Sequence, residues 1–255
     1  WSSRGTVVAI DEGGPARESV AYLVDVLPRH PRHARRRLPA NIASLGFLSL
    51  PQARRDAPSA IKRVLVSFGG EDPAGLTDRF LAVAIGGGFL APESITVVSG
   101  ALSRAGTNYP AVTAIGPVQD LKEMLRSYDL VVTQFGLTAF EAAWAGCAVL
   151  LLNPAREHED LAKAAGFVSL GVGTPGVATL RWVLADVPSL VSASRLAAPT
   201  ERLDLPARLS ALAPRHAGPC PICGASDGIA LYRTERKTYF RCQRCGMIRM
   251  AFFAP

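Results

Sequence analysis

The sequence of 255 residues lacks the signatures of several common protein classes. It contains no run near the ~20 apolar residues that a membrane helix needs, and no charged-then-apolar leader opens it, so we expect a cytoplasmic protein without membrane insertion. It has neither a G-x-G-x-x-G motif nor a lysine-containing P-loop, which argues against nicotinamide cofactors and ATP hydrolysis. No serine–histidine–acid order and no cluster of His, Asp and Glu stands out.

Cysteine is scarce, but four of the five cysteines form two C-x-x-C pairs, Cys220 with Cys223 and Cys242 with Cys245. Eighteen residues separate the pairs, a spacing that lets two knuckles meet around one tetrahedral zinc ion. Redox chemistry is the alternative, and two matched pairs favour structural zinc over it. Four thiolates fill the coordination sphere, so the sequence predicts no open position for metal catalysis.

Positive charge is concentrated near these cysteines. The formal net charge is +7, and residues 215–249 hold seven basic residues against two acidic ones. Tyr232, Tyr239 and Phe240 lie among them, so one hypothesis is a zinc ribbon that stacks on bases and binds the phosphates of a nucleic acid. The plainer alternative is a solvated, arginine-rich surface.

Apolar residues make up 49% of the chain, enough for one large or two modest packed domains. Strand-like and helix-like segments alternate in the middle of the chain, which predicts parallel strands with right-handed crossovers in a Rossmann-like α/β sheet. We expect strands over 63–68, 94–98, 111–115, 129–133, 148–152 and 168–170, and helices over 73–85, 119–127, 138–146, 157–165 and 177–184.

Two turns in this region predict anion binding. One follows the fourth of these strands, where Gly136 to Thr138 lead into a helix whose N-terminal N–H groups could hold a phosphate. Thr138 and Glu141 have the spacing of a capping box, although Glu141 could instead accept both hydroxyls of a ribose. The other turn, Gly69-Gly70, allows close approach by a diphosphate but is equally compatible with a structural role.

The next helix is expected to begin with Glu157, His158, Glu159 and Asp160. Acidic side chains in a first helical turn complement the helix dipole, which is the structural interpretation of this segment. The functional alternative is that His158 contacts a sugar hydroxyl.

Residues 60–185 resemble the C-terminal half of GT-B glycosyltransferases. The resemblance rests on VLVSFGGEDPAGLT (64–77) and IGPVQDLKEMLRSYDLVVTQFGLTAFEAAWAGCAVLLLNPAREHEDLAKAAG (115–166). It is strongest to the N-acetylglucosaminyltransferase of peptidoglycan synthesis and to the UDP-sugar hydrolase of pseudaminic acid synthesis, with its spore-coat polysaccharide relatives.

The resemblance implies a binding site for the UDP of a nucleotide sugar. Gly69 and Gly70 would lie near the phosphates, Val118 would pack beside the base, and Gly136, Leu137 and Thr138 would hold phosphate. Glu141 would bind the ribose, and His158 would stand where the family usually has a sugar-contacting glutamine. Phe135 and Leu137 depart from the small residues usual in the family's turn, so we expect them to crowd the approach of the phosphate.

The implied activity is that of a GT-B-type glycosyltransferase or UDP-sugar hydrolase in surface glycan or modified-sugar synthesis. Because such enzymes keep acceptor recognition and the catalytic base largely in an N-terminal domain, we expect the chain to be a fragment that lacks this half, and assign no catalytic residue. The expected domains are the end of a truncated N-terminal domain with a connector (1–57), the nucleotide-sugar domain (58–187), a linker (188–214) and the zinc ribbon (215–250).

The cysteine-containing segment resembles the zinc-binding segment that precedes class I S-adenosylmethionine-dependent methyltransferase domains. That resemblance covers about 35 residues. It implies a fused or docked methyltransferase as a partner, and it leaves open a non-catalytic scaffold as a further alternative.

Overall fold

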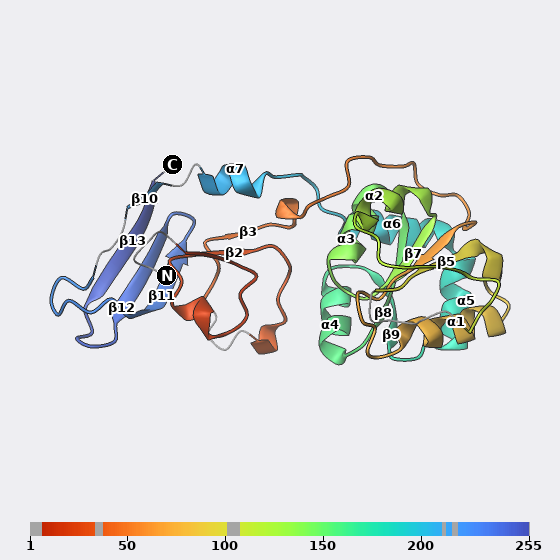
Figure 1. Ribbon diagram of the computed structural model, residues 1–255, viewed down its shortest axis with the longest axis horizontal. Coiled ribbons are helices and arrows are strands. Elements are labelled where there is room, and N and C mark those ends of the chain that lie inside the picture. Colours follow the sequence, from red (N-terminus) through yellow and green to blue (C-terminus); the bar gives the residue numbers. More distant parts are fainter. Residues whose placement is uncertain (1–6, 34–37, 101–107, 211–212, 216–218, 255) are drawn as a thin grey trace. The chain divides into compact units, whose positions relative to one another are not determined.

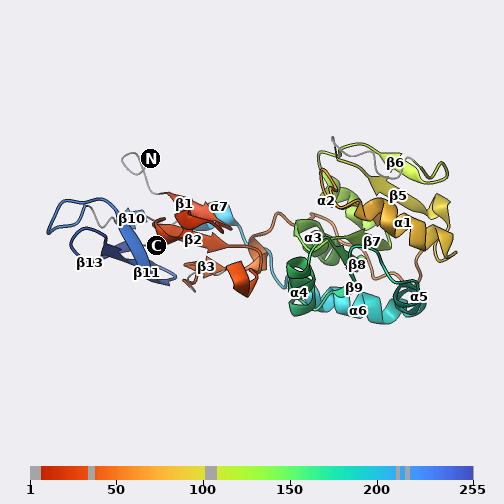
Figure 2. The same cartoon turned by 90° about the horizontal axis from the view of Figure 1, so that it is seen from below.

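The computed structural model describes residues 7–33, 38–100, 108–210, 213–215 and 219–254. The chain divides into two compact units (Figures 1 and 2). Unit 1 combines residues 1–48 with residues 201–255, and unit 2 comprises residues 49–200. None of the helices in the described ranges is long and apolar enough to cross a membrane.

Unit 2 is built on a six-stranded parallel sheet. Its strands are β4 (Val64–Val66), β5 (Ile95–Val98), β6 (Thr113–Ile115), β7 (Leu130–Thr133), β8 (Ala148–Asn153) and β9 (Val168–Val172). Their spatial order is β6-β5-β4-β7-β8-β9. Numbered from the first strand, this is the 3-2-1-4-5-6 order of a Rossmann fold, so the direction of winding reverses between β4 and β7.

Among the described residues of unit 2, six α-helices pack around this sheet. They are α1 (Leu76–Gly86), α2 (Leu121–Met124), α3 (Leu137–Ala145), α4 (Arg156–Ala164), α5 (Val177–Ala185) and α6 (Val187–Ala197), with 3-10 turns at Pro92–Ser94 and Leu125–Ser127. Every residue of β7 and β8 is buried, as expected for parallel strands covered on both faces. On one face, α1, α5 and α6 contribute side chains such as Phe80, Leu180 and Leu190 to the core.

Unit 1 contains two small sheets. The first is parallel and consists of β1 (Val8–Ile10), β2 (Tyr22–Asp25) and β3 (Ile42–Ala43), with 3-10 turns at Pro15–Glu18, Pro31–His33 and Leu45–Phe47. After helix α7 (Leu205–Ser210), the second sheet has the order β10-β13-β12-β11. Its strands are β10 (Ala213–Arg215), β11 (Gly228–Thr234), β12 (Lys237–Cys242) and β13 (Ile248–Ala254).

Buried polar contacts hold the two sheets of unit 1 together. The Asn41 amide donates hydrogen bonds to the Thr234 carbonyl (2.8 Å) and the Thr238 hydroxyl (3.2 Å), and its oxygen accepts the Leu23 N–H. Arg233 is 2% exposed and donates to the Arg17 and Val20 carbonyls, and burial lowers the pKa of its guanidinium to about 10. The N-terminal strands and the cysteine-containing sheet therefore form one packed body.

The predicted fold class is confirmed: unit 2 is an α/β Rossmann-like parallel sheet, and a small four-cysteine module lies near the C-terminus. The structure groups the flanking segments differently from the expected domains. Residues 49–57 belong to unit 2, where Arg55 forms an ion pair with Asp129 (2.6 Å). Part of the expected linker belongs to unit 2, since α6 buries Leu190 and Val191 in its core. His216, part of the predicted ribbon, lies outside the described residues.

Candidate functional site

The two glycine turns predicted from the sequence meet where the winding of the sheet reverses. Strands β4 and β7 are neighbours, and the turns follow their carboxyl ends. The side-chain amide of Gln134, after β7, donates a hydrogen bond of 3.3 Å to the carbonyl of Phe68, after β4. In open parallel sheets, ligands bind in the crevice outside the carboxyl ends of the strands at this reversal.

A third strand end closes one side of the first turn. Gly100 follows β5, and a Cβ atom built on it would overlap the backbone of Gly70. Gly69 itself has φ +91°, a left-handed conformation that favours glycine. The shape of this turn therefore requires glycine at Gly69 and at Gly100. The requirement at Gly100 could not be inferred from the Gly69-Gly70 pair alone.

The second turn leads into a helix whose N-terminus has no side-chain cap among the described residues. Helix α3 begins at Leu137 with Gly136 as N-cap, and no side chain accepts a hydrogen bond there. The predicted capping box is therefore wrong, since Thr138 is already the second helical residue and Glu141 lies a full turn into the helix. The predicted end of the helix is confirmed at Gly146, which has φ +93°.

The helix that follows the first turn is different, because a carboxylate of the chain occupies its N-terminus. Asp72 accepts hydrogen bonds from the N–H groups of Leu76 (2.8 Å) and Thr77 (2.9 Å) at the start of α1. Asp72 adopts φ +43° in doing so. An anion at the reversal point would accordingly meet open N–H groups at α3 rather than at α1.

A buried polar network, which the sequence analysis missed, fixes the backbone before α3. Asn153, at the end of β8, accepts the Phe135 N–H (2.9 Å) and donates to the Glu159 carboxylate (2.9 Å). Glu159 also accepts hydrogen bonds from Ser169 (2.5 Å) and pairs with Lys163 (3.0 Å). Burial acts to raise the pKa of Glu159, but these partners outweigh it and lower that pKa overall. The sequence signal for this network was Asn153 itself, a polar residue at the end of the apolar run 148–152.

Glu141 lies on the side of α3 that faces α2. Burial raises the pKa of its carboxyl, and the charge of Lys122 on α2 counteracts part of that effect. Among the described residues, no hydrogen bond satisfies this carboxylate. Val118, the residue predicted to pack beside the base, lies three positions before α2. Helix α2 in turn faces Glu141, the residue predicted to bind the ribose.

The remaining predicted contacts lie on α4 and in the turn before α3. His158 is in the first turn of α4, and its Nδ1 atom is buried without a hydrogen-bond partner in the described structure. Phe135 is 6% exposed and packs edge-on against Phe140, with ring centroids 5.7 Å apart, so it turns into the core. Leu137 is 52% exposed. Of the two side chains expected to crowd a phosphate, only Leu137 stays outside the core.

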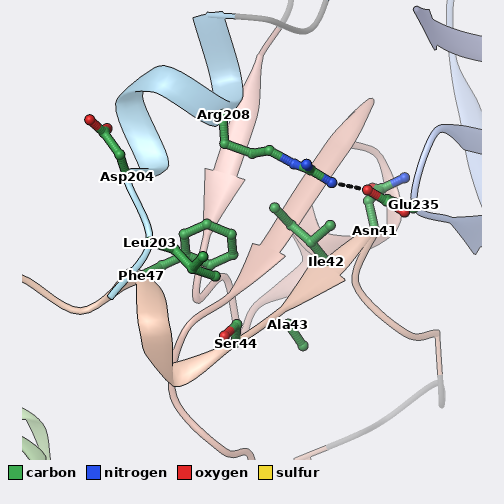
Figure 3. A pocket seen from close by; sticks show the side chains of 9 residues that line it. All are labelled: Asn41, Ile42, Ala43, Ser44, Phe47, Leu203, Asp204, Arg208 and Glu235. Carbon is green, nitrogen blue, oxygen red and sulfur yellow. Dashed lines mark hydrogen bonds and ion pairs between the residues drawn. The ribbon is translucent and has the colours of Figure 1, made fainter. Parts of the chain in front are cut away.

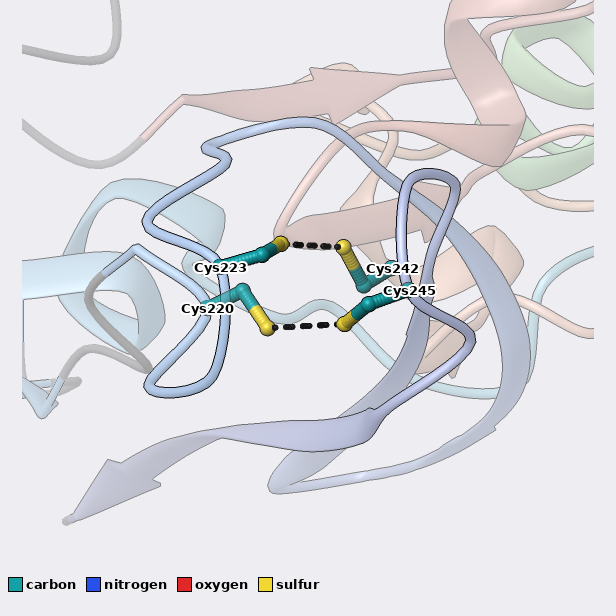
Figure 4. A group of neighbouring side chains, drawn as sticks. All are labelled: Cys220, Cys223, Cys242 and Cys245. Carbon is teal, nitrogen blue, oxygen red and sulfur yellow. Dashed lines mark hydrogen bonds between the residues drawn. The ribbon is translucent and has the colours of Figure 1, made fainter.

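The four cysteines of unit 1 converge from two loops (Figure 4). All four sulfur atoms lie within 4.8 Å of one another, with 3.4 Å between Cys220 and Cys245 and 3.6 Å between Cys223 and Cys242. Four thiolates about 2.3 Å from one zinc ion would be about 3.8 Å apart, so the donor set fits tetrahedral zinc.

The backbone of the two loops supports the same conclusion. In each, a glycine with left-handed φ donates its N–H to the carbonyl of the first cysteine, Gly224 to Cys220 and Gly246 to Cys242. Backbone N–H groups of Cys223 and Ile222 lower the pKa of the Cys220 thiol to about 6. For Cys245 the Met247 N–H acts to lower the pKa, but the hydrogen bond with Cys220 and burial outweigh it and raise that pKa to about 12. The fifth cysteine, Cys147, is buried, and burial raises the pKa of its thiol to about 12.

A hollow that the sequence did not predict lies within unit 1, between β3 and α7 (Figure 3). Its volume is about 470 Å³. The side chains of Arg208 and Glu235 approach each other across it and form an ion pair, while Ile42, Phe47 and Leu203 supply apolar surface. It is separate from the glycine turns, which belong to unit 2.

Comparisons with known proteins give structural similarity alone. No family model and no curated protein matches the chain. Similar solved structures include a putative UDP-N-acetylglucosamine 2-epimerase from Listeria monocytogenes (18% identity, TM-score 0.39, covering 60% of this chain and 44% of that one). A second is the calicheamicin glycosyltransferase CalG4 (14% identity, TM-score 0.44, covering 71% of this chain and 48% of that one). A third is the spinosyn forosaminyltransferase SpnP (19% identity, TM-score 0.43, covering 75% of this chain and 54% of that one). The match spans about half the length of these chains.

Proposed function

We infer that unit 2 binds a nucleotide sugar, with UDP as the nucleotide, in the crevice between β4 and β7. The observation that carries this inference is the meeting of the two glycine turns, where Gln134 links the turn after β7 to Phe68 at the end of β4. The reversal of winding at this point is where parallel sheets bind ligands, and two glycine-bearing turns let a diphosphate approach the backbone closely.

The proposed roles follow the positions of the side chains. The uncapped N-terminus of α3, from Gly136 to Thr138, would bind phosphate oxygens through backbone N–H groups and the helix dipole. Glu141 is partly buried without a hydrogen-bond donor among the described residues, so its carboxylate is available for the ribose hydroxyls. His158 would contact the sugar, and Val118 would flank the base.

The proposed reaction class is transfer or hydrolysis at the anomeric carbon, with UDP as the leaving group. Negative charge develops on the departing diphosphate, and the preorganised N–H groups of α3 would stabilise it without a metal ion. The activity would serve surface glycan or modified-sugar synthesis, and the acceptor and the catalytic base would be supplied from outside the described residues.

The four cysteines of unit 1 would bind zinc with a structural role. Cys220, Cys223, Cys242 and Cys245 provide all four ligands of a tetrahedral ion, which leaves no position for a substrate. Zinc would supply folding free energy to this small module rather than Lewis-acid chemistry.

Calorimetric titration of the zinc-loaded chain with UDP tests the proposal. We expect saturable binding that Glu141→Ala weakens by roughly 1.5–3 kcal/mol, the size of lost hydrogen bonds to a charged group. Glu93→Ala is the matched control, because Glu93 is an exposed glutamate at the amino-terminal edge of the same sheet, just before β5. A folded protein without measurable UDP affinity would exclude the proposed site.

A further inference from the structure

The cysteine-containing sheet of unit 1 presents one face that the described part of unit 1 does not cover. Side chains alternate along its strands, so that Thr238, Phe240 and Phe253 are buried, and Tyr22 packs edge-on against Phe253 (4.8 Å between centroids). The opposite, outer face is formed by cross-strand rows of directly paired residues. We define the outer face as Ile229, Tyr232, Thr234, Lys237, Tyr239, Arg241, Ile248, Met250 and Phe252.

Aromatic rings lie at the centre of this face. Tyr232 on β11 and Tyr239 on β12 are directly opposite each other, with ring centroids 6.3 Å apart and planes inclined by 38°. Tyr232 is 56% exposed, and Met250, which continues the row on β13, is 40% exposed. An exposed tyrosine beside a half-buried one on the adjacent strand forms a platform on which planar bases can stack.

Cations flank the aromatic row, and no acidic residue belongs to the face. Along β12, Lys237 and Arg241 stand two residues to either side of Tyr239 and therefore point the same way. The Lys237 ammonium lies 5.8 Å from the ring of Phe252. The nearby Glu235, at the tip of the hairpin, is already paired with Arg208.

We propose that the outer face binds single-stranded nucleic acid, with bases stacked on Tyr232 and Tyr239 and phosphates held by Lys237 and Arg241. The charge of the face favours this occupant: Lys237 and Arg241 are the charged residues of the outer face, and both are basic, which suits a polyanion. A second copy of the chain is disfavoured, because packing this face on itself would bring Lys237 and Arg241 against their own equivalents. The site is independent of the nucleotide-sugar crevice in unit 2.

The structure also corrects the residue set that the sequence suggested for this interaction. Phe240 was expected to stack with Tyr232 and Tyr239, but it is 7% exposed and belongs to the buried face of the sheet. Met250 completes the exposed row instead, because it pairs with Tyr239 across β12 and β13. Strand register, which the sequence did not provide, determines which residues share the outer face.

Fluorescence anisotropy of the full zinc-loaded chain with labelled oligouridylate and oligothymidylate, each about twelve nucleotides long, tests the proposal. We expect saturable binding at about 50 mM salt that weakens steeply towards about 200 mM. Tyr232→Thr, which keeps a residue suited to a strand, should weaken binding about tenfold or more, and Tyr232→Ala should do the same. Arg241→Glu should weaken binding and make it less dependent on salt.

Matched controls separate this face from general positive charge. Arg126→Glu and Trp182→Ala change an exposed cation and an exposed aromatic residue of unit 2, and should leave the affinity unchanged. Zinc content and circular dichroism of each variant verify the fold. Absence of binding by the unchanged chain at low salt overturns the proposal. Binding that is unchanged in Tyr232→Thr and Arg241→Glu also overturns the proposal. In either case the outer face would contact a protein partner or solvent instead of nucleic acid.

Discussion

The side chain of Asn153 holds the backbone of Phe135 in place, with 2.9 Å between the Asn153 Oδ1 atom and the Phe135 nitrogen. The same side chain donates to Glu159, also at 2.9 Å. Asn153 ends β8, whereas Phe135 lies immediately before the Gly136 turn, so the hydrogen bond couples one strand end to the turn that opens α3. The orientation of that turn thus depends on a fully buried amide.

Replacing Asn153 should therefore loosen the turn. Asn153→Leu has a similar volume but leaves the buried Phe135 N–H without a partner, which costs about 1–3 kcal/mol, whereas Glu159 keeps Ser169 and Lys163. We expect a loss of that size in the free energy of unfolding of unit 2, measured by urea denaturation, with faster amide exchange at Phe135. Asn108→Leu, at an exposed asparagine, is the control, and equal behaviour of both variants would refute the coupling.

The Gly70–Gly100 contact gives a second prediction. A side chain at position 100 would overlap the backbone of Gly70, so Gly100→Ala must displace the first glycine turn. If the crevice binds UDP as proposed, this variant should bind it at least about tenfold more weakly, since backbone N–H groups would move out of reach. Gly116→Ala is a fitting control, because a Cβ atom there meets nothing within 4 Å. If Gly100→Ala bound UDP with unchanged affinity, the first glycine turn would not take part in UDP binding.

Strand-helix alternation in the sequence predicted the sheet of unit 2 because its strands, such as Leu130–Thr133, are short apolar runs buried on both faces. Local pattern also predicted the cysteine pairs and the glycine at the end of α3. The contacts of Asn153 and Gly100 were not predictable in this way, since each depends on which strand ends become neighbours. The packing of residues 1–48 with residues 201–255 was not predicted either, because contacts such as that between Asn41 and Thr238 join residues far apart in sequence.

Asp129 makes the stability of unit 2 depend on pH, and the direction of that dependence follows from its contacts. It accepts hydrogen bonds from the N–H groups of Lys62 and Arg63 and pairs with Arg55 at 2.6 Å. Burial alone would raise the pKa of Asp129, but these contacts prevail and lower it. Its stabilising effect is therefore present above the unfolded pKa of about 4 and is lost as the pH falls through the lower folded value.

This stabilisation can be isolated with one substitution. Asp129→Asn should reduce the free energy of unfolding at neutral pH by roughly 1.5–3 kcal/mol, the range for hydrogen bonds to a charged group. The difference from the unchanged chain should shrink on acidification, when Asp129 itself becomes protonated. Urea denaturation at a series of pH values measures it, with the exposed Asp120→Asn as control. A difference that stays constant down to about pH 2 would contradict the assignment.

If the four cysteines bind zinc as proposed, removal of the metal should affect residues far from them in sequence. The loops that bring Cys220 and Cys242 together flank the sheet whose buried face contacts β2, and Thr238 donates to the Ala21 carbonyl at 2.7 Å. Because metal binding in such modules is folding free energy, a chelator should lower amide protection in β12 and in β2 together. Amides of β7, in unit 2, should keep theirs.

Hydrogen exchange followed by mass spectrometry resolves these segments in one experiment. Cys245→Ser should reproduce the effect of the chelator, because it removes one of four ligands, and Cys147→Ala should not, because Cys147 lies in unit 2 outside the cluster. If β2 kept full protection while β12 opened, the packing of Tyr22 and Asn41 against the cysteine-containing sheet would contribute little to the stability of the N-terminal strands. Joint loss in both segments would instead establish that metal at the C-terminal end maintains a sheet that begins at Val8.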